Sequence, residues 1–130
     1  MARGKIFLII ILTPAVLPIA TNAQTNFGAQ QVISDSAGGA RDVHAADLDG
    51  DGDLDVLSAS YIDDKIAWYR NDGSGNFGAQ QKIPIYRNGA NSVYAADLDG
   101  DGDQDFLSAS SGDDKIAWYE NDGSGAFGAQ

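Results

Sequence analysis

Two short stretches of the chain gather aspartates at a spacing that suits the binding of a hard metal ion. They are Asp47–Asp55 (DLDGDGDLD) and Asp97–Asp105 (DLDGDGDQD), and each places five carboxylates in nine residues. Such a density of negative charge is self-repelling unless a counter-charge is present. Carboxylates at positions 1, 3 and 5, followed by glycine at position 6, begin a calcium-binding loop, because calcium takes oxygen ligands from closely spaced acidic side chains. The pattern therefore predicts Ca²⁺ as the cofactor of both stretches.

Each aspartate of the two stretches has a predicted role in such a loop. In the first stretch, side-chain oxygens would come from Asp47, Asp49 and Asp51, a backbone carbonyl from Asp53, and a closing carboxylate from Asp55. The same roles fall on Asp97, Asp99, Asp101, Asp103 and Asp105 in the second stretch. The glycine at position 6, Gly52 in the first copy, would permit the sharp turn. A polar turn of aspartate and glycine that holds no metal is the alternative.

The residues that follow the loops exclude the helix-loop-helix type of calcium site. That site needs a bidentate glutamate at position 12, whereas this chain has Ser58 and Ser108 there. The residues after Asp55 are small or strand-forming, and they lack the 3.6-residue period of a helix. We therefore expect each loop to close early, at position 9, and to lead directly into a β-strand.

Composition narrows the classes of partner. The chain has 130 residues, one histidine, no cysteine and a formal net charge of −11, and ten of its 19 acidic residues lie in the two aspartate stretches. A nucleic-acid partner is not expected, because no basic patch is present to neutralise phosphates. Disulfides and thiolate metal sites are excluded by the lack of cysteine.

The first 23 residues differ from the rest and read as a secretory signal peptide. Arg3 and Lys5 precede an apolar run over residues 6–17, and residues 21–23 (TNA) form a small-x-Ala cleavage site. The alternative is a membrane anchor, although the apolar run is short for a span and Pro14 interrupts its end. We therefore expect an exported protein, secreted or at the cell surface, with no membrane association after cleavage.

The remainder, residues 24–130, is an internal repeat with a period of 50 residues. Aligning 39–80 with 89–130 leaves nine of 42 positions different. The units run over roughly 27–76 and 77–126, and a third unit is truncated. A fixed period of this length is typical of propellers, solenoids and arrays.

Within one unit the pattern predicts four short strands and no helix. The strands fall at 43–46, 55–61, 65–70 and 77–83, and the sequence NDGSG over 71–75 is a strong turn signal. Four strands in about 50 residues match one propeller blade. The predicted fold class is all-β, with blades of four antiparallel strands and about two blades present.

These units resemble the FG-GAP or VCBS-type repeat of integrin-like β-propellers. The matching residues are Phe77-Gly78, the segment Asn91–Ala96 and the loop Asp97–Asp105, and the resemblance covers about residues 25–130. It implies calcium ligands at the ten aspartates named above. Its functional implication is broad, because such repeats occur in adhesion receptors, lectins, surface proteins and non-catalytic domains of secreted polysaccharide-degrading enzymes.

The number of repeats is small for a propeller. Closed propellers typically have four to eight blades, whereas this chain supplies about two. It is therefore expected either to be a fragment of a longer array, which the truncated third unit favours, or to form a homo-oligomeric ring. In such a ring, the entering strand of one copy could complete the last blade of a neighbour.

No set of residues in the chain predicts an enzyme. A Ser-His-Asp set, a Cys-His pair and a phosphate-binding glycine loop before a helix are all missing from the sequence. The function favoured is a binding or adhesion scaffold for a protein or carbohydrate ligand. A multi-chain lectin and an accessory domain of a secreted hydrolase or lyase are the alternatives.

Several residues outside the loops have two interpretations. The single histidine, His44, is expected to be a packed or surface side chain. The Trp-Tyr pairs at 68–69 and 118–119 could stack on sugars, but packing between blades is favoured. Arg70 and Glu120 occupy the same repeat position with opposite charge, and we expect them to pair across neighbouring blades.

Overall fold

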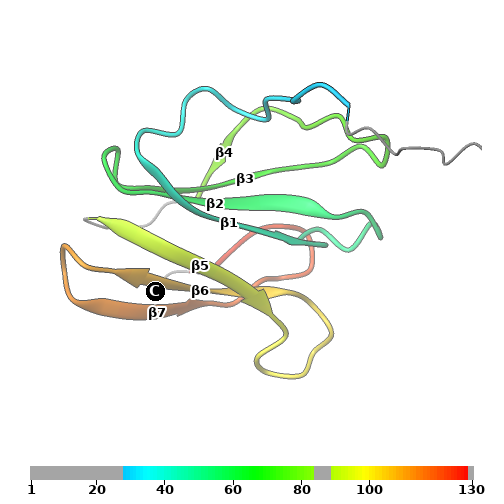
Figure 1. Cartoon of the computed structure of the whole chain (residues 1–130). Coiled ribbons are helices and arrows are strands. Elements are labelled where there is room, and N and C mark those ends of the chain that lie inside the picture. The colour runs from blue at the N-terminus through cyan, green and yellow to red at the C-terminus, as the bar shows by residue number, and fades with distance from the viewer. Residues whose placement is uncertain (1–27, 84–88, 129–130) are drawn as a thin grey trace, which may run out of the picture. The chain divides into compact units, whose positions relative to one another are not determined.

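A computed structural model describes residues 28–83 and 89–128 of the chain (Figure 1). The chain divides into two units, residues 1–30 and 31–130, and the account below concerns the second. The predicted signal peptide, residues 1–23, lies outside the described residues. Within the described part of the chain, no helix is long and apolar enough to cross a membrane.

The described residues of the second unit form seven short strands in two antiparallel sheets (Figure 1). The strands are β1 (Ala40–Ala46), β2 (Asp55–Ser60), β3 (Lys65–Tyr69), β4 (Gln81–Lys82), β5 (Ala90–Ala96), β6 (Asp105–Ser110) and β7 (Lys115–Tyr119). The first sheet, called blade 1, has the order β1-β2-β3-β4, and the second, called blade 2, has the order β5-β6-β7. The predicted all-β class with two partial propeller blades is confirmed.

The two blades reproduce each other's strand register, as the 50-residue repeat requires. Leu57 faces Trp68 across β2 and β3, and Leu107 faces Trp118 across β6 and β7. The hairpins turn through Asp64 and Asp114, both at positive φ (52° and 54°), a conformation that aspartate tolerates better than most residues.

Two strands of blade 1 differ from the prediction by more than one residue. The first strand begins at Ala40 rather than at residue 43, and a bulge between Ala40 and Asp42 accommodates the extension. The fourth strand, predicted over 77–83, shortens to Gln81–Lys82, and Phe77 forms only an isolated bridge with Asn71. The shortening has a local cause, because side-chain oxygens of Asn71 and the next residue accept hydrogen bonds from amides of the 73–76 turn.

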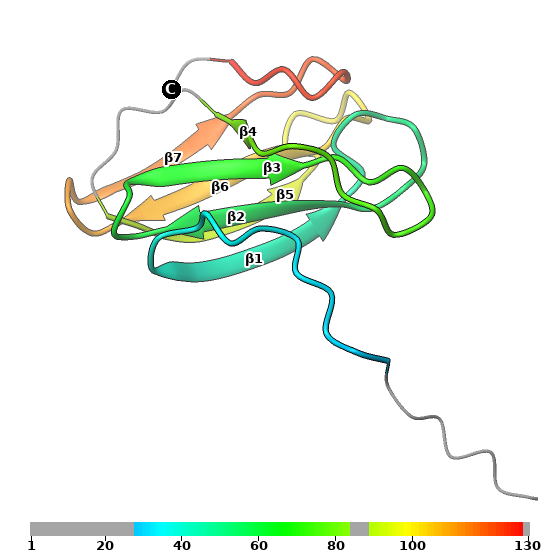
Figure 2. The ribbon, with the colours of Figure 1, turned by 90° about the horizontal axis from the view of Figure 1, so that it is seen from above.

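The core lies between the blades. On blade 1, side chains on one surface of the sheet, called its back face, are buried: Leu48, Leu57, Ala59, Ile66 and Trp68. On blade 2, the buried surface, called its front face, carries Val93, Phe106, Ala117, Tyr119 and the partly buried Phe127. The two sets form one apolar cluster, in which Phe106 stacks on Tyr119 with ring centroids 4.4 Å apart. Figure 2 shows the strands of the two sheets running one over the other.

Trp68 and Trp118 occupy the same repeat position but differ in burial. Trp68 is buried in the cluster between the blades and fits the predicted packing role, whereas Trp118 is 45% exposed. His44 is half-buried, and its ring lies 4.7 Å from that of Tyr94 at the equivalent position of blade 2.

Candidate metal-binding loops

The two aspartate stretches connect the first and second strands of their blades. Loop 1 is defined as residues 47–55 and joins β1 to β2, and loop 2 is residues 97–105 and joins β5 to β6. Each loop turns at its position 6 through a glycine of positive φ, 92° at Gly52 and 101° at Gly102. A side chain is strained in this conformation, which explains glycine at this position.

The first aspartate of each loop shapes the backbone around itself. Asp47 accepts hydrogen bonds from the amides of Gly50 (2.8 Å) and Gly52 (3.0 Å) through its two carboxylate oxygens. Asp97 does the same with Gly100 (2.7 Å) and Gly102 (3.1 Å). The loop therefore curls around the carboxylate that is predicted to be its first ligand.

The structure brings together the three predicted side-chain ligands of each loop. Carboxylate oxygens of Asp47, Asp49 and Asp51 lie within 4.8 Å of one another in loop 1. In loop 2 the same holds for Asp97, Asp99 and Asp101. Three oxygens at this separation can face a single cation.

The side chains of the other two aspartates of loop 1, Asp53 and Asp55, lie outside this carboxylate cluster. The Asp53 carboxylate sits against Gly73, where it leaves no room for a β-carbon. Asp55 is fully buried, and its carboxylate accepts hydrogen bonds from the amides of Leu48 (3.2 Å) and Asn71 (2.8 Å). Burial raises the pKa of Asp55, and the charges of nearby aspartates add to this effect.

Loop 2 places its last two aspartates in the same way. Asp103 lies against Gly123, and the buried Asp105 accepts hydrogen bonds from the amides of Leu98 (3.2 Å) and Asn121 (2.8 Å). In both blades the aspartate at position 9 therefore ties the loop to the end of the third strand. The sequence pattern predicts only a metal-binding role for Asp55 and Asp105 and does not indicate this structural one.

Arg70 contributes to loop 1 in a way that the sequence did not predict. Its Nε lies 2.7 Å from Asp49 Oδ2, and its Nη2 lies 2.9 Å from Asp51 Oδ2. The expected pairing with Glu120 across the blades is therefore wrong, because Arg70 binds carboxylates of its own blade. The available signal was the reversal of charge at this repeat position, combined with the β2–β3 register that brings residue 70 next to the loop.

The surroundings of two aspartates, Asp51 in loop 1 and Asp103 in loop 2, shift their pKa values in opposite directions. A hydrogen bond from the Asp53 amide and then the Arg70 guanidinium lower the pKa of Asp51. In loop 2, loss of hydration and then the charges of Asp101 and Asp97 raise the pKa of Asp103. Loop 1 therefore carries a counter-charge, and loop 2 has a carboxylate, Glu120, at the equivalent position.

The side chain of Asp49 provides a test of whether a cation fits. It is 8% exposed, and within the described part of the chain its buried Oδ1 has no hydrogen-bond partner. A buried carboxylate oxygen without a partner is costly, and such groups commonly mark the site of a bound ion or water. All the clustered donors are hard oxygens, the type that calcium prefers. The residues of the cluster therefore fit a calcium ion.

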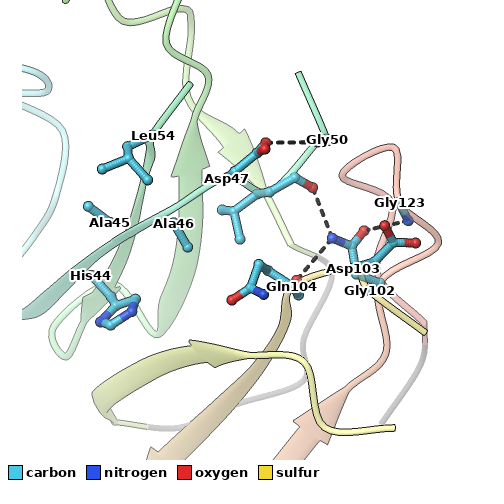
Figure 3. Close-up of a pocket in the computed structure, with 12 residues that line it drawn as sticks. His44, Ala45, Ala46, Asp47, Gly50, Leu54, Gly102, Asp103, Gln104 and Gly123 are labelled. Atoms are coloured by element: carbon cyan, nitrogen blue, oxygen red, sulfur yellow. Dashed lines mark hydrogen bonds between the residues drawn. The ribbon is translucent and has the colours of Figure 1, made fainter. Parts of the chain in front are cut away.

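A cavity of about 380 Å³ lies between the two blades, beside both loops (Figure 3). His44, Leu54, Asp103 and Gln104 are among the residues that line it. In the wall of the cavity, the Asn121 side-chain amide donates hydrogen bonds to the carbonyls of Leu48 and Gln104, both at 2.9 Å. This bridge fixes loop 1 against the end of loop 2.

Comparison with known protein families matches the FG-GAP-like repeat over residues 9–58, 47–108 and 97–130. The three matches together span most of the chain, and the last two each begin at an aspartate loop. No curated protein matches the chain. The resemblance inferred from Phe77-Gly78 and the aspartate loops is confirmed.

Proposed function

Because the chain belongs to the FG-GAP-like repeat family, we propose that it is an exported, calcium-binding β-propeller module. It would act as a non-catalytic scaffold for binding or adhesion. The observation that carries the calcium proposal is the cluster of Asp47, Asp49 and Asp51, in which Asp49 Oδ1 has no hydrogen-bond partner among the described residues. Calcium would neutralise the clustered charge, which the carboxylates cannot do for one another.

A neutralised cluster would let loop 1 hold one conformation, and the residues around the cluster would transmit this order to blade 1. Asp47 fixes the loop backbone through two glycine amides, and Asp55 joins the loop to the end of β3. Leu48, between them, is fully buried in the core that the two blades share. A fixed loop therefore holds Leu48 in place and supports the packing of blade 2 on blade 1.

The test compares thermal unfolding with and without calcium in a loop variant. Calcium at a hundredfold excess over its Kd stabilises the folded state by about 2.7 kcal/mol per site. Asp49→Ala should remove the calcium protection of loop 1 and leave that of loop 2. Asp35→Ala, which removes an exposed aspartate outside both loops, is the matched control. Equal calcium-induced shifts in parent and Asp49→Ala would count against the proposal.

Export is proposed on the composition of residues 1–23. N-terminal sequencing of the protein secreted from an expressing cell should begin at Gln24. Retention in the membrane with an intact N-terminus would support the anchor alternative instead.

A carbohydrate-binding role is a second candidate, and the cavity between the blades favours it. A volume of about 380 Å³ lies in the range of small-molecule sites, and the lining combines the apolar Leu54 with the polar His44 and Gln104. A glycan array should detect binding that His44→Ala reduces. No binding to any glycan would leave the scaffold role alone.

A further inference from the structure

The charged groups that line the cavity between the blades are all of one sign. The carboxylates of Asp47 and Asp103 line it, and no lysine or arginine is among its lining residues in the described part of the chain. Arg70, by contrast, lines a separate groove of blade 1. A cavity that holds carboxylates and no basic side chain attracts a cation and repels an anion.

Calcium in the loops would not remove this preference. The five aspartates of loop 2 and Glu120 carry a formal charge of −6, which one calcium ion reduces only to −4. Asp47 is committed to its own loop, because both of its carboxylate oxygens accept glycine amides. Asp103 differs, because its carboxylate has no hydrogen-bond or ion-pair partner among the described residues. Asp103 is therefore the carboxylate that is left for a ligand.

Two further polar side chains that line the cavity have unused hydrogen-bonding groups. The Gln104 side-chain amide and the His44 imidazole form no hydrogen bond with another described residue, since the Gln104 carbonyl that Asn121 binds belongs to the backbone. Figure 3 shows His44 on one side of the pocket and Gln104 beside Asp103. An amide and an imidazole can both donate to and accept from the hydroxyl groups of a ligand.

The one position at which the two loops differ lies at this cavity. Loop 1 has Leu54 where loop 2 has Gln104, and both residues line the cavity. Leu54 is 59% exposed, so it presents an apolar surface to the same space as the Gln104 amide. A sugar ring combines hydroxyl groups with an apolar face of C–H groups, which a lining of this mixed kind suits.

We propose that the cavity binds an amino sugar, that is, a sugar that carries a protonated amine. The proposal names the ligand class of the carbohydrate-binding candidate above and rests on that candidate. The ammonium group donates hydrogen bonds to the Asp103 carboxylate, the hydroxyls contact Gln104 and His44, and the apolar ring face lies on Leu54. The Asn121 bridge between the two loops holds this site together before the ligand arrives.

An NMR titration of the isotope-labelled chain at saturating calcium tests this inference with three matched sugars. Glucosamine, N-acetylglucosamine and glucose share one ring, and at about pH 7 only glucosamine is positively charged. It should bind with a Kd on the order of 1 mM, as expected of so small a ligand, and should shift the Gln104 side-chain amide signals. The two neutral sugars should bind at least about tenfold more weakly, because they lack the charge-assisted hydrogen bond.

The outcomes separate this inference from the candidate on which it rests. Equal affinity for the three sugars would keep the carbohydrate candidate and overturn the role of the amine. Binding to none of them would overturn the inference, while the glycan array would still decide the candidate. Butylamine, which has the charge and no hydroxyl group, should bind more weakly than glucosamine. Equal affinity for these two amines would contradict the sugar part of the inference.

A variant of Asp103 tests the proposed contact. Asp103→Asn removes the charge but keeps the shape of the side chain and the backbone carbonyl that is predicted to bind calcium. It should raise the Kd for glucosamine at least about tenfold. Glu120→Gln, the matched control, removes a negative charge beside loop 2 from a residue that does not line the cavity, and its effect should be smaller. An equal effect of the two variants would overturn the assignment to Asp103, provided that calcium titration and melting show both loops intact.

A second variant tests the polar wall of the cavity. Gln104→Leu gives loop 2 the residue that loop 1 carries at this position. It should raise the Kd for glucosamine about threefold to tenfold, the effect of losing a neutral hydrogen bond, and should keep the preference over glucose because Asp103 remains. Unchanged affinity in Gln104→Leu would contradict the contact between the sugar hydroxyls and this amide.

Discussion

Loop 1 and loop 2 share eight of nine residues and the hydrogen bonds that their first aspartates accept, but their electrostatic surroundings differ. In loop 1 the guanidinium of Arg70 contacts two carboxylates of the cluster. In loop 2 the equivalent residue is Glu120, and loss of hydration, followed by the charges of neighbouring aspartates, raises the pKa of Asp103. The comparison teaches that the charge balance of such a loop depends on a residue beyond its motif, at the end of the third strand.

The buried aspartates at position 9 of the two loops should contribute equally to stability. Asp55→Ala and Asp105→Ala each leave two backbone amides without their acceptor. At about 1–3 kcal/mol for each buried unsatisfied group, both variants should lose roughly 2–6 kcal/mol of unfolding free energy. Urea denaturation in EDTA measures this loss. A loss below about 1 kcal/mol in either variant would show that its position-9 aspartate is not a structural tie.

Exchanging the charges outside the loops should reverse their order of calcium affinity. Arg70 must leave Asp49 and Asp51 before these carboxylates can share a cation, so loop 2 should bind calcium more tightly than loop 1. Exposed ion pairs contribute up to about 1 kcal/mol, which corresponds to roughly a fivefold change in Kd. Arg70→Glu should strengthen loop 1 by about this factor, and Glu120→Arg should weaken loop 2.

The readout for the charge exchange is calorimetric titration of each variant. Arg41→Gln, which removes a cation that lies over the Tyr61 ring instead of a loop, is the control and should change neither Kd. Unchanged affinities in Arg70→Glu would mean that the guanidinium does not compete with the metal.

A smaller contrast lies where the blades touch at equivalent positions. Asp42 of β1 accepts hydrogen bonds from the Ser92 hydroxyl (2.6 Å) and the Val93 amide (2.9 Å) of β5. The Ser92 hydrogen bond is the main cause that lowers the pKa of Asp42 below 3.8. The carboxylate therefore contributes stability above pH 3.8, and this contribution is lost as the pH falls through the lowered pKa.

Melting temperatures of Asp42→Asn and the parent should thus differ slightly at neutral pH and converge at the acidic end. Ser92→Ala, which removes the hydroxyl, should show the same convergence. A difference between Asp42→Asn and the parent that persists at pH 2 would mean that the carboxylate charge is not its cause.

The fold was predictable from sequence because its signals are local. The alternation of strand-forming residues and the turn residues at 71–75 predicted the strands, and the aspartate spacing predicted the cluster of three carboxylates in each loop. The fourth strand was overestimated because the strand pattern over 77–83 says nothing of the Asn71 and Asp72 side chains that hold the adjoining turn.

The missed features of the site depend on contacts that sequence spacing does not reveal. Arg70 lies 19 positions after Asp51, and only the antiparallel register of β2 and β3 brings the two together. The amide bonds of Asp55 arise in the same way, because Asn71 follows β3 and Leu48 precedes β2. A nine-residue motif cannot show whether its last carboxylate faces a metal or the backbone.

The most direct measurement of the central claim is a calcium titration of the chain by calorimetry, paired with melting in EDTA. The account predicts two calcium sites of unequal affinity. Their dissociation constants should lie within or below the range of about 10⁻⁴–10⁻³ M that is typical of extracellular calcium modules. It also predicts a lower melting temperature once the metal is removed. Absence of heat at millimolar calcium, with melting unchanged by EDTA, would contradict it.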